Sequence, residues 1–332
     1  MQKRITDPKQ HIEEDEKIER SLRPKSIEEI IGCEKEKRAL KIMIEAAKSR
    51  KEPLDHILFH GPPGLGKTSW ANVVANEMGV PIYTTSGPAI ERQGDLAAIL
   101  TNIPENGIFF IDEIHRLHKS VEEILYPAME DKVIDIVIGK GPSAKTIRLE
   151  LANFSVIGAT TRINLVSAPL RSRFGIDLRL DFYSYEELTK LIKQKARKFG
   201  ISIDSDAAYI LAKRSRRTPR IAERLLKRVR DYAEVNNGAK VTLNEAEKTL
   251  EMLEIDELGL DYIDRRLLTI LIKDFKGGPV GLSTLAAAID EDLDTVQDVY
   301  EPFLLREGLL VRSPRGRMVT KRAYDHLGIK QS

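Results

Sequence analysis

The chain has 332 residues, of which 42% are hydrophobic and 31% are charged, and its net charge is +2. This composition is typical of globular proteins, and the length favours two or three domains over one. The single cysteine, Cys33, excludes an intramolecular disulfide and fits a reducing compartment. No apolar run approaches the roughly 18 residues of a membrane span, and Met1–Pro8 lacks the apolar stretch of a signal peptide, so we expect a cytoplasmic protein.

The first half of the chain alternates between two kinds of pattern. Residues 1–20 are polar and charged, and we expect a flexible N-terminal arm there. From residue 21 to 183, short apolar runs alternate with helical patterns, which predicts an α/β fold with a parallel sheet flanked by helices. The predicted strands are His56–Phe59, Pro81–Thr84, Gly107–Ile111, Ser155–Gly158 and Ile176–Leu180.

A different sequence pattern interrupts this alternation at about 133–151. Two runs of alternating apolar residues flank the Gly- and Pro-containing turn 139–143, which predicts an inserted β-hairpin. Its apolar residues either pack on the core or meet a partner, and the pattern alone does not decide between these.

Residues 184–255 follow helical periodicity throughout, with a capping signal from Thr242 to Glu245, and predict a small helical lid. In the remaining segment, 256–332, three helical patterns precede two short apolar runs around the turn Ser313–Arg317. This order is typical of a winged-helix domain, a relative of the helix-turn-helix DNA readers.

Charge separates the two candidate DNA-binding surfaces of this last segment. Asp290–Glu301 carries six acids and no base, whereas Arg306–Ser332 carries seven basic residues against two acidic ones. We therefore expect the basic hairpin to contact DNA phosphates through Arg312 and Arg317, without reading bases. The alternative is a winged helix that binds protein.

The strongest local signal is a phosphate-binding loop. Residues 61–68 read GPPGLGKT and match G-x-x-x-x-G-K-[ST], after a predicted strand and before a helical pattern that starts at Ser69. Glycines such as Gly64 and Gly66 let backbone N–H groups surround phosphates, and the helix N-terminus adds partial positive charge. Lys67 is expected to hold the β- and γ-phosphates and Thr68 to bind Mg²⁺.

A second signal lies at the end of the third predicted strand. The apolar run Ile108–Ile111 is followed by Asp112 and Glu113, at the edge where open α/β sheets bind ligands. Asp112 is expected to complete the Mg²⁺ shell, and Glu113 to polarise the water that attacks the γ-phosphate. An intact Glu113 favours ATP hydrolysis over nucleotide sensing alone.

The order of these motifs resembles that of AAA+ ATPases, and several longer stretches are similar to the RuvB family in particular. These stretches lie in all three expected domains and cover nearly the whole chain after residue 20. They are Leu22–Lys25, Gly61–Thr68, Thr84–Pro88, Asp112–Leu117, Leu125–Asp131, Gly158–Arg162, Arg173–Ile176, Thr218–Ala222, Gly277–Leu282 and Ser313–Met318.

The resemblance implies roles that residue spacing does not provide. It implies that Thr161 senses the γ-phosphate, and that Arg173 is an arginine finger that enters the site of a neighbouring subunit. It also implies that Arg220 reaches the nucleotide from the lid. Further nucleotide contacts are implied for Leu22, Arg23, Glu130, Asp131 and Tyr183.

The function implied by the resemblance is that of an ATP- and Mg²⁺-dependent motor, an ATP hydrolase that drives branch migration of Holliday-junction DNA in recombination and repair. A finger that acts in trans implies a closed homo-oligomeric ring, by similarity a hexamer around the duplex arms of the junction. The resemblance further implies RuvA as a partner that docks on the 133–151 hairpin, and it is compatible with RuvC as a second partner.

Three other classes remain open. A protein-remodelling unfoldase would need an aromatic-bearing loop in its pore, and the basic C-terminal hairpin argues against it. A DNA loader would hydrolyse nucleotide once per loading event rather than continuously. A non-enzymatic binding module is disfavoured by intact Lys67, Asp112 and Glu113.

Overall fold

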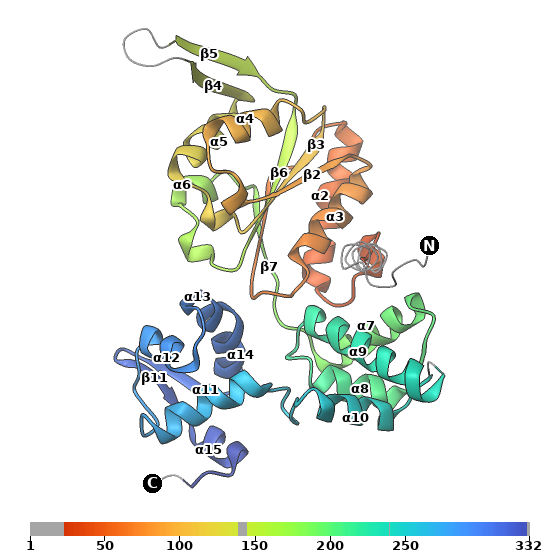
Figure 1. Cartoon of the computed structure of the whole chain (residues 1–332). Helices are drawn as coiled ribbons and strands as arrows, with labels where there is room; N and C mark the ends of the chain where they lie inside the picture. Colours follow the sequence, from red (N-terminus) through yellow and green to blue (C-terminus); the bar gives the residue numbers. More distant parts are fainter. Residues whose placement is uncertain (1–22, 139–144, 239, 331–332) are drawn as a thin grey trace, which may run out of the picture. The chain divides into compact units, whose positions relative to one another are not determined.

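The computed structural model describes residues 23–138, 145–238 and 240–330. It divides into two compact units (Figure 1). The first contains the chain up to Gly61 together with Gly66–Asp181, and the second contains Pro62–Leu65 together with the chain from Phe182 onward. The expected arm at 1–20, Leu22 and the hairpin turn at 139–143 lie outside the described residues.

A five-stranded parallel sheet forms the centre of the first unit, in the order β2-β3-β6-β1-β7. The inner strands are buried along almost their whole length, because a parallel sheet is covered on both faces. All five predicted strands are present, with ends that differ by one or two residues. They are β1 (Ile57–His60), β2 (Ile82–Ser86), β3 (Gly107–Asp112), β6 (Phe154–Thr160) and β7 (Ile176–Arg179).

Helices cover both faces of this sheet, with α2 (Glu34–Arg50) and α3 (Lys67–Met78) on one face and α4 (Gln93–Leu100) and α5 (Lys119–Glu130) on the other (Figure 1). Trp70 of α3 is 1% exposed, and its ring centroid lies 6.0 Å from that of Phe59 on β1. This packing fixes α3 on the sheet. The shorter helical elements of the unit are η1 (Ile27–Glu29), η2 (Gly87–Ala89), η3 (Ile114–Arg116), η5 (Ile163–Leu165) and α6 (Ala168–Arg171).

The predicted hairpin is present as β4 (Val133–Ile138) and β5 (Lys145–Glu150), which pair antiparallel. Ile134 is fully buried in the core of the first unit, and Ile136 packs against that core. Ile147, which pairs with Ile136 in the hairpin, is 44% exposed. The core-packing reading is therefore confirmed for Ile134 and Ile136 of β4, whereas Ile147, on the same face of the hairpin, remains exposed.

The second unit begins with the helical lid, made of α7 (Tyr185–Lys198), α8 (Ser205–Lys213), α9 (Pro219–Asn237) and α10 (Leu243–Met252). The predicted capping signal is confirmed, because Glu245 accepts a hydrogen bond of 3.1 Å from the backbone N of Thr242. The lid also contains a two-residue parallel pair, β8 (Ser202–Ile203) with β9 (Lys240–Val241). The sequence did not predict this pair, because two residues are too few to show a period.

The winged helix follows in the same unit and contains the predicted helices and hairpin. Its third helix has a π-helical segment in the middle, and α15 after the hairpin was not predicted. None of the helices that the structure describes combines the length and apolar character needed to cross a lipid bilayer. The elements are α11 (Tyr262–Lys273), α12 (Leu282–Ile289), α13 (Leu293–Thr295), η6 (Val296–Tyr300), α14 (Glu301–Arg306), β10 (Leu310–Ser313), β11 (Gly316–Val319) and α15 (Lys321–Leu327).

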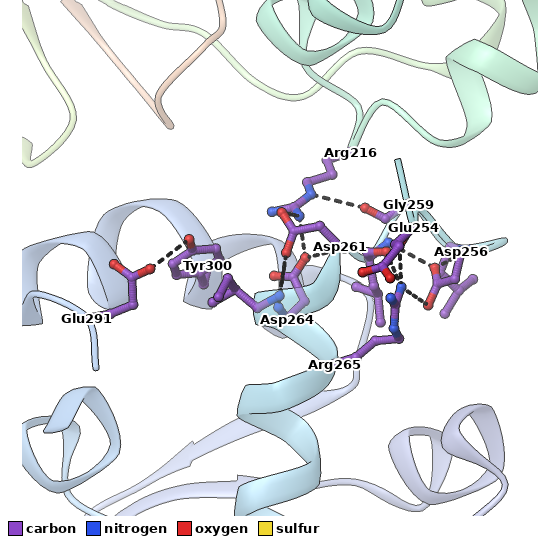
Figure 2. Close-up of polar contacts among 12 residues, drawn as sticks. Arg216, Glu254, Asp256, Gly259, Asp261, Asp264, Arg265, Glu291 and Tyr300 are labelled. Carbon is purple, nitrogen blue, oxygen red and sulfur yellow. Dashed lines mark hydrogen bonds and ion pairs between the residues drawn. The ribbon is translucent and has the colours of Figure 1, made fainter. Parts of the chain in front are cut away.

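A buried ion cluster fastens the lid to the start of α11 (Figure 2). Arg216 donates to the carbonyl oxygen of Gly259 at 3.1 Å and to Asp261 at 2.6 Å, and it also binds Asp264, which is fully buried. Burial raises the pKa of Asp264 to about 7, against the lowering by the Arg216 guanidinium. Two carboxyl groups therefore share one guanidinium inside the fold.

Candidate functional site

The loop between β1 and α3 is built around glycines with positive φ angles. Gly61, Gly64 and Gly66 have φ angles of +146°, +79° and +87°, a region that residues with side chains rarely adopt. At Gly61 a side chain is also excluded by space, because a Cβ would lie 2.2 Å from the carbonyl oxygen of Leu180. The sequence therefore places glycine where the loop backbone adopts angles that other residues rarely adopt and, at Gly61, where it passes close to Leu180.

Lys67 is the first residue of α3 and is only 7% exposed. Its Nζ donates a hydrogen bond of 2.9 Å to the carbonyl oxygen of Gly61, which offsets part of the free energy needed to bury an ammonium group. The cation is thus held inside the loop that matches the phosphate-binding pattern. Ser69 lies in the first turn of the same helix.

Two oxygen-bearing side chains that could bind a metal ion lie close together, one at the start of α3 and one at the end of β3. The Thr68 hydroxyl donates to Asp112 Oδ2 at 3.4 Å. Oxygens that bind one octahedral Mg²⁺ side by side lie about 3 Å apart, so this pair fits the ion closely. No cluster of three or more His, Cys, Asp or Glu side chains in the described part of the chain could hold a metal. The pair fits Mg²⁺, which usually takes one or two protein carboxylates and completes its shell with phosphates and water.

Glu113 follows β3 directly and adopts φ of +48°. Its Oε2 accepts a hydrogen bond of 3.3 Å from the Thr161 hydroxyl and lies 3.2 Å from His115 Nδ1. Thr161 comes immediately after β6, which pairs with β3, so the sheet order brings the two predicted residues together. His115 was not predicted. It also lies 2.9 Å from the Thr160 hydroxyl.

Arg173 lies two residues after α6 and is 21% exposed. One guanidinium nitrogen donates to the carbonyl oxygen of Pro169 at 2.6 Å, and another pairs with Glu130 at 3.2 Å. Glu130 is 56% exposed, so this pair is screened by solvent and contributes little to stability. Asp131 follows at the C-terminal end of α5, where its backbone N donates to the carbonyl oxygen of Pro127.

The second unit contains Tyr183 and Arg220. The backbone N of Arg220, in the first turn of α9, donates to the carbonyl oxygen of Gly64 at 3.2 Å. The lid residue therefore lies at the phosphate-loop segment that belongs to its own unit. Tyr183 is 5% exposed, and its carbonyl oxygen accepts a bond of 2.8 Å from Arg217. Arg23, in the first unit, is half-buried.

The wing arginines are bound to a carboxylate that sequence reasoning did not single out. Glu301 is 1% exposed, and both of its oxygens accept bonds of 2.8–3.2 Å from Arg312 and Arg317. Burial raises the pKa of Glu301, but the two guanidinium groups lower it more, so the pKa lies below its usual range. Arg312 remains 53% exposed, whereas Arg317 is 19% exposed. Arg315, in the turn between β10 and β11, is exposed.

Family models match almost the whole described chain. Residues 22–180 match the Holliday junction DNA helicase RuvB P-loop domain, residues 183–256 match the RuvB AAA lid domain, and residues 257–328 match the RuvB C-terminal winged helix domain.

Solved structures give the same result. The structure described as the Thermotoga maritima RuvB Holliday junction branch migration motor is 49% identical, with a TM-score of 0.86. A point variant of Thermotoga maritima RuvB is 50% identical, with a TM-score of 0.87. Each alignment covers 93% of this chain and 99% of the other.

Proposed function

This chain belongs to the RuvB family, and on that premise we propose that it hydrolyses ATP to drive branch migration of Holliday-junction DNA in recombination and repair. The observation that carries the proposal is the grouping of Thr68 with Asp112 and of Glu113 with Thr161 at the ends of β3 and β6. A Thr and an Asp that can hold Mg²⁺, beside a carboxylate that can position water, are parts that recur in P-loop ATPases.

In this proposal the residues of the first unit divide the chemistry between them. Lys67 binds the β- and γ-phosphates, while Thr68 and Asp112 hold Mg²⁺, which neutralises charge on the phosphates. Glu113 orients the attacking water. Thr161 responds to the γ-phosphate through its hydroxyl, which also donates a hydrogen bond to Glu113. The hydrogen bond between Thr161 and Glu113 supports a direct link between sensing and hydrolysis.

Other residues would bind the rest of the nucleotide. Gly64, Gly66 and Ser69 would contact the phosphates from the loop and the first turn of α3. Arg220 would contact them from the lid, a role supported by its backbone bond to Gly64. Leu22, Arg23 and Tyr183 are proposed to line the adenine and ribose pocket, and Glu130 and Asp131 are proposed as further nucleotide contacts.

Arg173 would act in trans, as an arginine finger in the site of the next subunit. Its outer nitrogen is paired only with the exposed Glu130 among the side chains of the described residues, and a phosphate can replace such a screened partner readily. A head-to-tail contact of this kind closes into a ring when the rotation permits. We propose a homo-hexamer that encircles duplex DNA.

The wing would contact DNA phosphates and leave the bases unread, as a motor on any sequence requires. The exposed Arg312 is the better donor of the two predicted arginines, since Arg317 is largely covered. The exposed turn residue Arg315 joins it in the proposal.

The remaining parts of the proposal concern organisation and partners. We propose domain limits at 21–183, 184–255 and 256–332, after an arm at 1–20. The 133–151 hairpin would dock on RuvA, and the exposed Ile147 offers it an apolar contact. RuvC is a further proposed partner, and the proposed compartment is the cytoplasm.

Branch migration of a synthetic four-way junction tests this function. Wild type, Glu113→Gln and the matched control Glu123→Gln, an exposed glutamate of α5, would each be incubated with RuvA, ATP and Mg²⁺. We expect the wild type and the control to dissociate the junction and Glu113→Gln to leave it intact while still binding ATP. Continuous ATP hydrolysis by the wild type without junction movement would instead favour a loader or a remodelling enzyme.

A further inference from the structure

One face of α5 carries three polar residues, of which two contact Arg173 and the third binds one of those two. Glu122, Tyr126 and Glu130 are spaced four apart, which places them one above another along the helix. Glu130 pairs with Arg173 at the exposed end, and Glu122 is 7% exposed at the buried end. Tyr126 lies between them.

The guanidinium of Arg173 lies over the face of the Tyr126 ring. The guanidinium carbon lies 4.6 Å from the ring centroid, which is cation–π distance. Arg173 Nε is buried and, among the described residues, has no hydrogen-bond partner. A buried donor without an acceptor is costly in a fold, whereas the cation as a whole is favoured by the electron-rich face of the Tyr126 ring. The carbonyl oxygen of Pro169 then sets the direction of the group.

The hydroxyl of Tyr126 is itself fixed. It donates to Glu122 Oε2 at 2.7 Å, and Ser167 Oγ donates to the same oxygen at 2.7 Å. Ser167 caps α6 by accepting from the Leu170 N at 3.3 Å, and Arg173 follows that helix. Burial raises the pKa of Tyr126 above its usual value, so the hydroxyl keeps its proton. The same carboxylate therefore joins the helix that carries the ring to the turn that carries the arginine.

We propose that Tyr126 is a positioning residue for Arg173, whose ring holds the guanidinium and whose anchored hydroxyl holds the ring. The inference rests on the proposed function, because it assumes that Arg173 completes the site of a neighbouring subunit. A 1 Å displacement of a catalytic group lowers rates by about a hundredfold, so a finger on a long side chain gains from such a support.

The first test compares steady-state ATP hydrolysis by Tyr126→Leu, Tyr126→Phe and the control Tyr209→Leu, an exposed tyrosine of α8. We expect kcat to fall roughly ten- to a hundredfold in Tyr126→Leu and only a few-fold in Tyr126→Phe, which keeps the ring. The KM for ATP is expected to change by less than about twofold, because Tyr126 does not touch the subunit's own phosphate loop. A loss of kcat/KM that comes only from a higher KM, with kcat unchanged, would overturn the proposal.

The second test asks whether Tyr126 acts through Arg173. Adding Tyr126→Leu to Arg173→Ala should lower kcat no further, because the residue that Tyr126 positions is already gone. A further tenfold loss in the double variant would mean that Tyr126 acts by another route, and would overturn the proposal. If Arg173→Ala alone keeps full activity, it is the trans role of Arg173 in the proposed function that fails.

The third test mixes subunits. Glu113→Gln subunits cannot hydrolyse ATP but carry an intact Tyr126 and Arg173, while Tyr126→Leu subunits keep an intact site of their own. Mixed rings should hydrolyse ATP several-fold faster than the two proteins measured apart, since the first supplies a well-placed arginine to the second. Mixing without any gain would overturn the proposal.

Discussion

The buried carboxyl of Asp264 should make the second unit less stable as the pH rises. Burial raises its pKa in the folded protein to about 7, from an ordinary value of 3.8. Between these two values the folded protein keeps the proton and the unfolded chain has lost it, so unfolding releases a proton. The stabilisation is therefore complete below 3.8 and is lost as the pH rises to the folded pKa.

The size of the effect follows from the same two values. Each pH unit between them removes about 1.4 kcal/mol, and the loss flattens as the pH passes 7. Integrated from pH 5 to pH 8, the free energy of unfolding should fall by about 2–3 kcal/mol on account of Asp264 alone. Asp264→Asn should abolish this dependence, because the amide keeps an acceptor for Arg216 and does not titrate.

Urea unfolding of the wild type and Asp264→Asn between pH 5 and pH 8 measures this difference. Far-UV circular dichroism reports both units, whereas fluorescence of Trp70, the chain's only tryptophan, reports the first unit and is the internal control. We expect the stability of the variant relative to the wild type to rise with pH in the dichroism and to stay constant in the fluorescence. A difference that is the same at every pH in both signals would refute the reasoning, since Asp264 would then be ionised throughout.

Three further predictions concern single contacts. Glu301→Gln should remove the carboxylate that neutralises part of the wing's charge. In anisotropy titrations with duplex DNA, the slope of log K against log salt concentration should then be steeper by about 0.9. An unchanged slope would argue against the pairing. Trp70→Ala should lower the free energy of unfolding by about 3–5 kcal/mol in urea, whereas a loss below about 1 kcal/mol would mean that the helix packs without it. Gly316→Ala should disorder the wing, because φ is +140° and a Cβ would lie 2.3 Å from the Val280 carbonyl oxygen; hydrogen exchange of the Val280 amide should accelerate, and unchanged protection would contradict the strain.

The elements that the sequence predicted best are those with a local signal. Strand β3 reads as a buried apolar run, and Asp112 and Glu113 follow it without a gap. Thr161 was implied only by the resemblance; its hydrogen bond to Glu113 follows from the carboxyl ends of β3 and β6 sharing one edge of the sheet. The glycines of the loop were predictable for the same reason, because their backbone angles are a local property.

The contacts that were missed depend on residues far apart in the chain. Arg312 and Arg317 were expected to be available to phosphates, yet Glu301, more than ten residues earlier, pairs with both. Glu301 was not recognised because it is one of six acidic residues in Asp290–Glu301. Nothing in the neighbouring sequence shows which of these side chains is buried. The four-residue spacing of Glu122 and Tyr126 was visible in the sequence, but its meaning depends on where the turn after α6 brings Arg173.

The pairing of Glu301 in α14 with Arg312 and Arg317 in the wing has a consequence for how an arginine meets a ligand. A free arginine loses up to about 2 kcal/mol of rotational freedom when it is fixed in one geometry. Arg312 and Arg317 lose this conformational freedom when the protein folds, because Glu301 binds both side chains. In the proposed DNA contact, a phosphate would meet the Arg312 guanidinium already in position, and the guanidinium would still be in position for the next phosphate. Contacts that need no reordering can be made and released quickly along a repeating backbone.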